Sequence, residues 1–368
     1  MKKIVFISNI IAPYRVPFFN ELSKCKNIAL NVLYVALSEK NRTWNVNKEE
    51  LKYTYNIIPG FHMPYFFKTG TMHISYNYKY FFDMANPDII IVGTDLIGSS
   101  ISWGAIRYAK KRGISLIRFE GQHCSNNPIS NMKSIIYNNF YKSFDGFFVY
   151  SHLTKNYLIE KYNVSDDIIK VGYNVGDLSR FFKNKYKKND EQKIKILFCG
   201  SLDSRKNIIF LMNILKEKFD KQNLVFTIVG EGPYLHKIKS LSKKFLNMEV
   251  QIKGSLYNDK LIQEYAASDI FILPSIYDAA SIVVTEALAS GLFTIGSKFD
   301  GSAINFIKNK VNGLIIDPNN QNSIIDALNW SLGHIKDKSY SKALIRKTME
   351  EYALVNYVER LSEWSIIK

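Results

Sequence analysis

Short apolar runs rich in β-branched and aromatic residues alternate with longer stretches of helical spacing in the first half of the chain. The runs cover residues 2–8, 29–36, 88–93, 114–120 and 146–151, and a helical stretch at 17–24 follows the first of them. Runs of this length are typical of buried strands, and helices between them make the strands parallel. The pattern therefore predicts an α/β fold with a parallel sheet.

The same alternation resumes after a break and continues through the second half. Here the apolar runs cover residues 193–200, 224–230, 249–254, 269–275, 292–297 and 313–317. One hydrophobic core rarely organises a chain of 368 residues, so two sheets in two domains are the natural expectation. We expect two Rossmann-like domains, over residues 1–176 and 193–345.

The segment between these halves, residues 177–192, loses the apolar periodicity and is rich in lysine. We expect it to be the linker between the domains. Apolar residues recur at helical spacing near the end of the chain, which predicts a helical segment over residues 346–368 that packs across the domain junction. The positions expected on the apolar face of this region are Leu344, Met349, Tyr352, Val355, Val358 and Leu361.

Composition narrows the class of protein. Apolar residues make up 46% and charged residues 22% of the chain, a balance that excludes a largely disordered or fibrous protein. Three widely separated cysteines, Cys25, Cys124 and Cys199, match no metal-binding spacing and fit a reducing, cytoplasmic compartment. The net charge of +16 favours an anionic partner, such as nucleic acid, a phosphorylated substrate or an acidic membrane surface.

Two features bear on a membrane. No apolar run approaches the roughly 20 residues that a membrane helix needs, and the first run lacks the cleavage site of a signal peptide, so we expect a core strand there. Aromatic and basic residues interleave between Tyr65 and Phe82, a pattern that suits a lipid headgroup surface or, equally, core and strand edge. The basic charge agrees with a peripheral position on the inner face of a cytoplasmic membrane.

Two carboxylates, Asp278 and Glu286, flank the start of a predicted helix in the sequence YDAASIVVTEALASG. The backbone amides of Ser281, Ile282 and Val283 open that helix without intrahelical acceptors, which makes them a ready site for a diphosphate. Glu286 lies one turn further in, where a carboxylate can accept two ribose hydroxyls, and Asp278 can hold hydroxyls of a sugar. For an isolated pair, a turn or capping Asp and a solvated Glu would be the commoner explanation.

The surrounding sequence favours the functional interpretation. The segment DIFILPSIYDAASIVVTEALASGLFTIGS resembles the signature of glycosyltransferase family 4, also called glycosyl transferases group 1, a family of retaining enzymes with the GT-B fold. Asp278 and Glu286 stand at its two acidic positions, although the first is usually Glu. The resemblance implies two Rossmann-like domains with parallel sheets facing a central cleft, a nucleotide-sugar site in the C-terminal domain and a C-terminal helix that crosses back to the N-terminal domain.

Further segments follow family motifs in the same order, beginning with FCGSLDSRKN. Gly200 and Lys206 match the motif, whereas Ser201 stands where the family commonly has Arg. Arg205 is the adjacent cation that can supply the missing charge, since either cation can neutralise a departing diphosphate. The alternative is an ordinary solvated pair in a loop.

The segments VGEGPYLHKI and NGLIIDP also resemble family motifs. Gly230 and Gly232 in the first are expected to allow close approach of the backbone, although a Gly-x-Gly-Pro after a strand is most often a tight turn. In SKFDGSAINFI, the family segment ends in Gly-Gly and a nearby Glu, where this chain has Ser302 and Asn305. No catalytic role is expected at these two positions.

Loops after predicted strands of the N-terminal half carry candidate acceptor contacts. Tyr14 and Arg15 stand in NIIAPYRVPFFNEL, where many family members have a Gly-Gly loop, and Arg42 and Trp44 stand in KNRTWNV. By analogy with other open α/β folds, such loops face the ligand. We therefore expect these four residues to bind the acceptor.

Glu120, in IRFEGQH, stands where family members often have His. A carboxylate there can orient or deprotonate an acceptor hydroxyl, and a hydrogen-bonded structural Glu at a strand end is the equal alternative. His123 lies close by, but one His without a second ligand is more often structural. No metal site is visible, and the resemblance implies that none is required.

The resemblance implies transfer of a hexosyl or related group from a nucleoside-diphosphate sugar, UDP-sugar most commonly, to a glycan or lipid-linked hydroxyl with retention of configuration, in bacterial surface polysaccharide or lipopolysaccharide synthesis. The candidate catalytic residues are Asp278, Lys206, Arg205 and Glu120. An epimerase of the same architecture and an inactive nucleotide-sugar-binding subunit remain alternatives, the latter because of Asp278 and Ser201. A nucleic-acid-binding protein is a third, although no matching motif is present.

Overall fold

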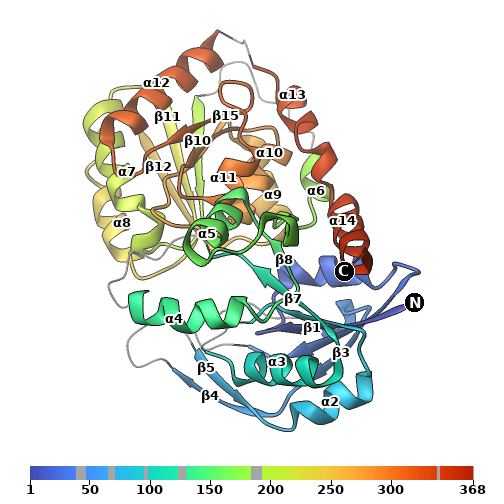
Figure 1. Ribbon diagram of the computed structural model, residues 1–368. Coiled ribbons are helices and arrows are strands. Elements are labelled where there is room, and N and C mark those ends of the chain that lie inside the picture. The colour runs from blue at the N-terminus through green and yellow to red at the C-terminus, as the bar shows by residue number, and fades with distance from the viewer. Residues whose placement is uncertain are drawn as a thin grey trace. The chain divides into compact units, whose positions relative to one another are not determined.

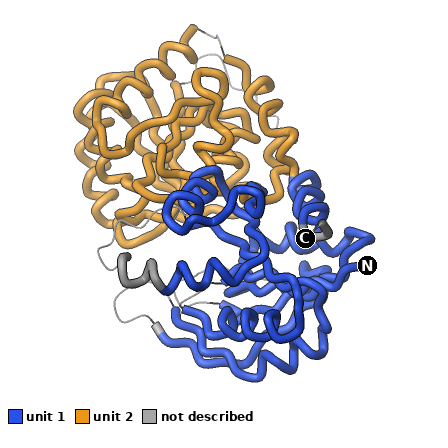
Figure 2. The backbone as a smooth tube through the Cα atoms, in the orientation of Figure 1, with its two compact units in different colours: residues 1–172, 354–368 blue, residues 173–353 orange. Residues whose placement is uncertain are grey.

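The computed structural model describes residues 1–38, 47–64, 71–94, 98–122, 130–183, 193–337 and 340–367. The chain divides into two compact units (Figure 2), unit 1 with residues 1–172 and 354–368, and unit 2 with residues 173–353. The expected linker begins inside unit 2, where Ser179–Phe182 form helix α6, and residues 184–192 lie outside the described residues.

Unit 1 is built on a seven-stranded sheet in the order β3-β2-β1-β6-β7-β8-β9, with every neighbouring pair parallel. A separate antiparallel ribbon, β4-β5, lies outside it. The strands are β1 Lys2–Ser8, β2 Ile28–Tyr34, β3 Thr54–Ile57, β4 Gly60–Pro64, β5 Thr71–Ser75, β6 Ile89–Val92, β7 Ser115–Glu120, β8 Gly146–Val149 and β9 Ile169–Val171.

Helices cover both faces of this sheet because alternate strand residues feed two separate cores. Val5 and Ile7 of β1 belong to one core, whereas Ile4 and Phe6 belong to the other, as the period of two in a strand requires. The helices of unit 1 (Figure 1) are η1 Pro13–Arg15, α1 Val16–Leu22, η2 Lys48–Glu50, α2 Tyr78–Ala85, α3 Ser100–Arg112, α4 Ser130–Tyr141, α5 His152–Tyr162, η3 Asp166–Ile168 and α14 Leu354–Ile367.

The C-terminal segment returns to unit 1 as α14, which packs against α1. Two of the positions expected on its apolar face are wrong: Leu344 is 67% and Val355 is 59% exposed. The reason is a break in the helix, because α13 ends before a 3-10 turn and α14 starts afresh at Leu354. The new helix buries Leu354, Tyr357, Val358 and Leu361, which keep the i, i+3, i+4, i+7 spacing of a single face.

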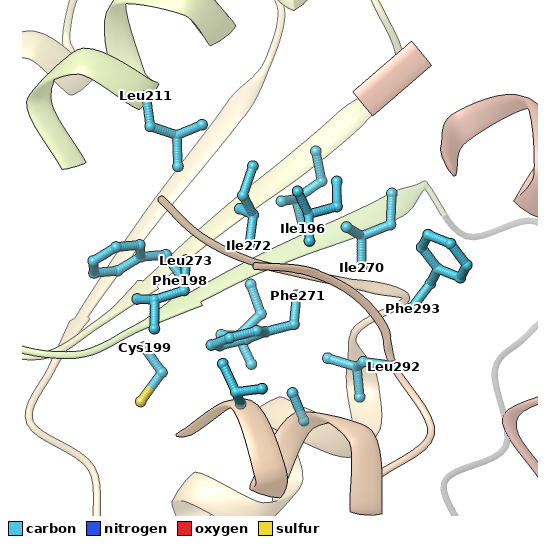
Figure 3. Packing of buried hydrophobic residues seen from close by; sticks show 14 of the residues in the cluster. Ile196, Phe198, Cys199, Leu211, Ile270, Phe271, Ile272, Leu273, Leu292 and Phe293 are labelled. Atoms are coloured by element: carbon cyan, nitrogen blue, oxygen red, sulfur yellow. The ribbon is translucent and has the colours of Figure 1, made fainter. Parts of the chain in front are cut away.

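Unit 2 is built on a six-stranded parallel sheet in the order β12-β11-β10-β13-β14-β15. Its strands are β10 Ile194–Cys199, β11 Leu224–Val229, β12 Glu249–Gly254, β13 Ile270–Leu273, β14 Phe293–Ser297 and β15 Gly313–Ile316. All four residues of β13 are buried, and Figure 3 shows them packed with those of β10 in the core.

The helices of unit 2 follow the strands in the alternation that the sequence predicts. They are α6 Ser179–Phe182, η4 Ser204–Lys206, α7 Ile208–Ile214, the π-helical turn η5 Leu215–Phe219, α8 Leu235–Ser242, α9 Asn258–Ala267, α10 Ile282–Ala289, α11 Gly301–Phe306, α12 Gln321–Lys336, α13 Lys342–Lys347 and η6 Glu350–Tyr352. The predicted α/β fold with two Rossmann-like halves is thus confirmed, and the edge strands β3 and β9 are additions to it.

Candidate functional site

The motif residues of unit 2 gather where the strand order reverses. The chain moves from β10 through β11 to β12 on one side and then crosses to β13 on the other, so β10 and β13 are neighbours at a topological switch point. Ligands of open α/β sheets bind outside the carboxyl ends of strands at such a point. The loop after β10 carries Arg205 and Lys206, and the loop after β13 carries Asp278.

Asp278 and the two cations form one ionic cluster. The Asp278 Oδ2 atom lies 2.5 Å from Lys206 Nζ and 3.1 Å from Arg205 Nη1. Lys206 is buried, whereas the Arg205 side chain is 42% exposed. The two loops are also joined through the backbone, since the Ile276 amide donates to the Arg205 carbonyl at 2.9 Å. Arg205 Nη2 also lies 3.9 Å from Asp203 Oδ2, so the cluster at the strand ends holds two cations and two carboxylates.

Asp300 is a member of the site that the sequence analysis missed. Its backbone forms a parallel bridge with Asp278, and its Oδ1 atom accepts the amides of Ser302 at 2.8 Å and Ser281 at 3.3 Å. The Ser281 hydroxyl donates to the other carboxylate oxygen. Burial, with repulsion from Asp278, raises the pKa of Asp300 to about 7. The only sequence signal was an Asp at the N-cap position of the short helix α11.

The first turn of α10 lies next to this cluster but offers fewer amides than expected. The Ser281 amide donates to Asp300 at 3.3 Å, so the expected contact of this amide with a diphosphate stays a prediction that would have to replace that hydrogen bond. Ile282 and Val283 are the first helical residues, and their amides have no acceptor within the helix. They remain the candidate donors for a phosphate at this helix end.

Glu286 lies one turn into α10 and is partly buried. Burial raises its pKa to about 7, and a hydrogen bond from the Tyr265 hydroxyl, 2.9 Å from Oε2, opposes that rise. Tyr265 comes from α9 and is fully buried. Near it, burial and the Glu286 charge raise the pKa of the Cys199 thiol to about 12, so this thiol is neutral. The sequence analysis missed Tyr265 because a buried tyrosine on a helix resembles ordinary core.

The loop after β10 is fixed from inside and from the next loop. Ser201 donates to Asp203 Oδ2 at 2.8 Å, and Asp203 caps η4 by accepting the Lys206 amide. Gly230 approaches so closely that a Cβ atom there would lie 1.9 Å from the Gly200 carbonyl oxygen. A Cβ on Gly232 would lie 2.6 Å from the Leu202 carbonyl oxygen. The two glycines of the Gly-x-Gly-Pro segment therefore serve contact between loops, which holds Lys206 in place.

Glu120 occupies a different position from the one expected of a catalytic base. Its Oε1 atom accepts the amides of Gly121 and Gln122, both at 2.9 Å. Its Oε2 atom accepts Arg118 Nε and Nη2 at 3.0 and 2.9 Å and the Tyr141 hydroxyl at 3.2 Å. Both oxygens are engaged and the residue is buried. These contacts favour the structural alternative, in which Glu120 shapes the end of β7, and the catalytic role stays a prediction.

The remaining candidate residues of unit 1 fall into two groups. Tyr14 is exposed and Arg15 partly exposed, both in η1 just after β1. Arg42, Trp44 and His123 lie outside the described residues.

Within the described ranges, no group of three or more His, Cys, Asp or Glu side chains could hold a metal ion. No helix in those ranges is long and apolar enough to cross a bilayer.

Two Rossmann-like units with parallel sheets are the fold of GT-B glycosyltransferases, and such enzymes are among the structural neighbours of this chain. The lipopolysaccharide outer core galactosyltransferase WaaB in its apo form superposes with a TM-score of 0.76 at 17% identity, over 99% of both chains. HepE of Anabaena, in complex with UDP, superposes with a TM-score of 0.77 at 14% identity, over 100% of both chains. At these identities the likeness shows the fold.

The sequence comparisons are more specific for unit 2. Residues 179–348 match the family model described as "Glycosyl transferases group 1". The chain is 24% identical to an uncharacterized glycosyltransferase of Methanocaldococcus jannaschii, MJ1069, over 73% of this chain and 71% of that protein. It is 27% identical to the Escherichia coli "UDP-Gal:alpha-D-GlcNAc-diphosphoundecaprenol alpha-1,3-galactosyltransferase" over 35% of this chain and 34% of that protein.

Other matches are partial. A second uncharacterized glycosyltransferase of M. jannaschii, MJ1607, is 28% identical, and the matched segment spans 44% of its length. The chain thus covers less than half of several relatives it matches. Together the fold and these matches support a group 1 glycosyltransferase.

Proposed function

We propose that this protein is a retaining glycosyltransferase that moves a hexosyl group from a nucleoside-diphosphate sugar to a hydroxyl of a glycan acceptor. The observation that carries the proposal is the cluster of Lys206, Arg205 and Asp278 beside the first turn of α10, at the switch point of the unit 2 sheet. Cations and unpaired amides at one such point suit a diphosphate.

The residues have separate roles in this proposal. Glu286 in its ionised form accepts the two ribose hydroxyls, and the amides of Ile282 and Val283 hold the diphosphate. Lys206 and Arg205 neutralise the charge that develops as the bond between the sugar and the phosphate breaks. Asp278 keeps both cations in place and lies where it can contact the sugar. The mechanism assigns no step to a metal ion.

UDP-sugar is the donor we propose, since two structural neighbours were solved with such ligands: HepE with UDP and with UDP-glucose, and an E. coli protein with UDP-2-fluoro glucose. The acceptor we propose is a lipid-linked glycan of a bacterial surface polysaccharide or lipopolysaccharide, since the E. coli relative is named for a diphosphoundecaprenol-linked acceptor and WaaB for the lipopolysaccharide outer core. The enzyme would then work in the cytoplasm at the inner face of the membrane.

An exposed apolar face of unit 1 agrees with such peripheral contact. Phe61 and Met63 of β4 pair with Ile74 and Met72 of β5, and three of these four side chains are exposed, Phe61 by 66%. The net charge of +16 adds attraction to an anionic surface. Sedimentation with anionic vesicles tests the contact, and binding that survives Phe61→Ser with Ile74→Ser would argue against this face.

A screen of nucleotide sugars by thermal shift identifies the donor, and incubation with that donor and membrane lipid extract then tests transfer. We expect stabilisation by one nucleotide family and a product in which the sugar keeps its anomeric configuration. Interconversion of the donor sugar without acceptor would identify an epimerase instead. Donor binding with neither transfer nor hydrolysis would identify an inactive binding subunit.

A further inference from the structure

Arg15 of unit 1 is held in an unusual way for a cation. Its guanidinium carbon lies 5.0 Å from the centre of the Phe119 ring, 5.4 Å from that of Tyr150 and 5.8 Å from that of Tyr14. Its Nη2 atom also donates to the Tyr150 hydroxyl. Three rings from three separate segments therefore pack around the guanidinium and limit its movement.

No negative charge balances this cation in the described part of the chain. Arg15 forms no ion pair there, and the single hydrogen bond to Tyr150 uses one of the five N–H donors of a guanidinium. Burial raises the pKa of the Tyr150 hydroxyl, so this partner is a neutral phenol. Arg15 is half-buried, and neither Nε nor Nη1 is among the fully buried side-chain atoms that lack a partner, so these two nitrogens keep some contact with solvent.

The position of Arg15 in the sheet is that of a ligand site. It ends η1, directly after β1, and β1 stands between β2 and β6, where the strand order of unit 1 reverses. Phe119 and Tyr150 stand at the carboxyl ends of β7 and β8, strands that lie in the same sheet as β1 in Figure 1. Ligands of such sheets bind outside these strand ends at the switch point.

We propose that Arg15 binds a phosphate group of the acceptor. The aromatic rings would hold the guanidinium for bidentate hydrogen bonding to two phosphate oxygens. A fixed guanidinium fork matches two oxygens of a phosphate, whereas a lysine would offer a point charge only. The proposal rests on the proposed function, in which unit 2 supplies its own cations, Lys206 and Arg205, to the donor diphosphate. The charge of Arg15 is therefore available to a second phosphorylated ligand.

The test uses inorganic pyrophosphate as the probe and calorimetric titration of the full-length protein, first without UDP and then with UDP at saturation. With UDP bound, we expect one pyrophosphate to bind wild-type protein and Arg15→Gln to weaken it by about tenfold or more, as loss of a charged hydrogen-bonding partner does. Arg107→Gln removes an equal charge from the exposed side of α3 and should change nothing. Tyr150→Phe should weaken pyrophosphate by a smaller factor, because only one hydrogen bond is lost.

The other outcomes are distinct. Pyrophosphate binding that is equal in wild type and Arg15→Gln, with or without UDP, overturns the proposal. Competition between UDP and pyrophosphate at a site weakened by Arg15→Gln would assign Arg15 to the donor phosphates and overturn the acceptor assignment. Failure of wild-type protein to bind any nucleotide would refute the proposed function. The titration of pyrophosphate without UDP would still measure binding at Arg15, as the difference between wild type and Arg15→Gln. Hydrogen exchange of peptides from β1, β7 and β8 equal to that of wild type would show that unit 1 is folded in Arg15→Gln and Tyr150→Phe.

Discussion

Replacing Asp300 by Asn tests the electrostatics of the candidate donor site. The change keeps the shape of the side chain, and the amide oxygen can still accept the backbone amides of Ser281 and Ser302. The new NH₂ group can donate to the Ser281 hydroxyl, which now donates to the carboxylate. The substitution therefore removes a buried charge with little loss of hydrogen bonding.

The expected magnitude follows from the pKa of Asp300. A carboxyl whose pKa rises from 3.8 to about 7 carries a penalty on the order of 4 kcal/mol when it ionises, at about 1.4 kcal/mol for each pH unit. The pKa of Asp300 is higher in the folded than in the unfolded state. Its contribution to the free energy of unfolding is therefore largest below about pH 4 and is lost as the pH rises through about 7. The Asp300→Asn variant lacks this dependence, so it should be more stable than wild type at about pH 8, by up to about 4 kcal/mol.

The stability of unit 2 is measured by urea unfolding at pH 5, 6, 7 and 8. Hydrogen exchange of peptides from β13 and β14 monitors the unfolding. Asp326→Asn is the matched control, since Asp326 is exposed on α12, and it should follow wild type at every pH. An Asp300→Asn variant with the same pH dependence as wild type would refute the reasoning. So would an Asp300→Asn variant that is less stable than wild type at pH 8, which would mean that the charge of Asp300 stabilises the fold.

Three further predictions concern single side chains. Tyr265→Phe removes a hydrogen bond that lowers the pKa of Glu286. In a plot of UDP affinity against pH, the midpoint of the transition should therefore move above about 7. An unchanged midpoint would mean that Glu286 does not take part in nucleotide binding. Lys206→Ala should lower kcat by a factor of about 10²–10³, the effect of removing one donor to a developing anion. The control Lys216→Ala, on an exposed face, should leave kcat unchanged. Equal kcat in the two variants would exclude Lys206 from the chemical step. Glu120→Gln removes the carboxylate charge that faces the buried Arg118, so the free energy of unfolding of unit 1 should fall by about 3 kcal/mol. The exposed residue Glu160 supplies the control, Glu160→Gln. Normal stability with abolished transfer would instead support Glu120 as a catalytic base.

The strands and the centre of the site could be predicted from the sequence because both are local. Apolar runs marked each strand of the unit 2 sheet, and the spacing from Asp278 to Glu286 spanned one loop and one helix start. Edge strands β3 and β9 were missed because they carry short, weak apolar signals. The apolar face of the last helix was placed wrongly because the break at Ala353 resets its phase.

The partners of the site residues could not be predicted, since they come from distant segments. Asp300 reaches Ser281 only because the loops after β13 and β14 form a bridge. Tyr265 meets Glu286 across two helices. Glu120 looked like a free carboxylate at a strand end, and the structural alternative is favoured because Arg118, Tyr141 and two amides occupy both oxygens.

The central claim is that the start of α10 and the cluster beside it bind the donor nucleotide. Calorimetric titration of UDP into wild-type protein, Glu286→Ala and the exposed control Glu217→Ala of η5 tests it most directly, at pH 8 where Glu286 is ionised. The account predicts one site in wild type and in the control, and affinity at least about tenfold weaker in Glu286→Ala, as loss of hydrogen bonds to a charged group implies. Equal UDP affinity in all three proteins, or no UDP binding by wild type, would contradict it.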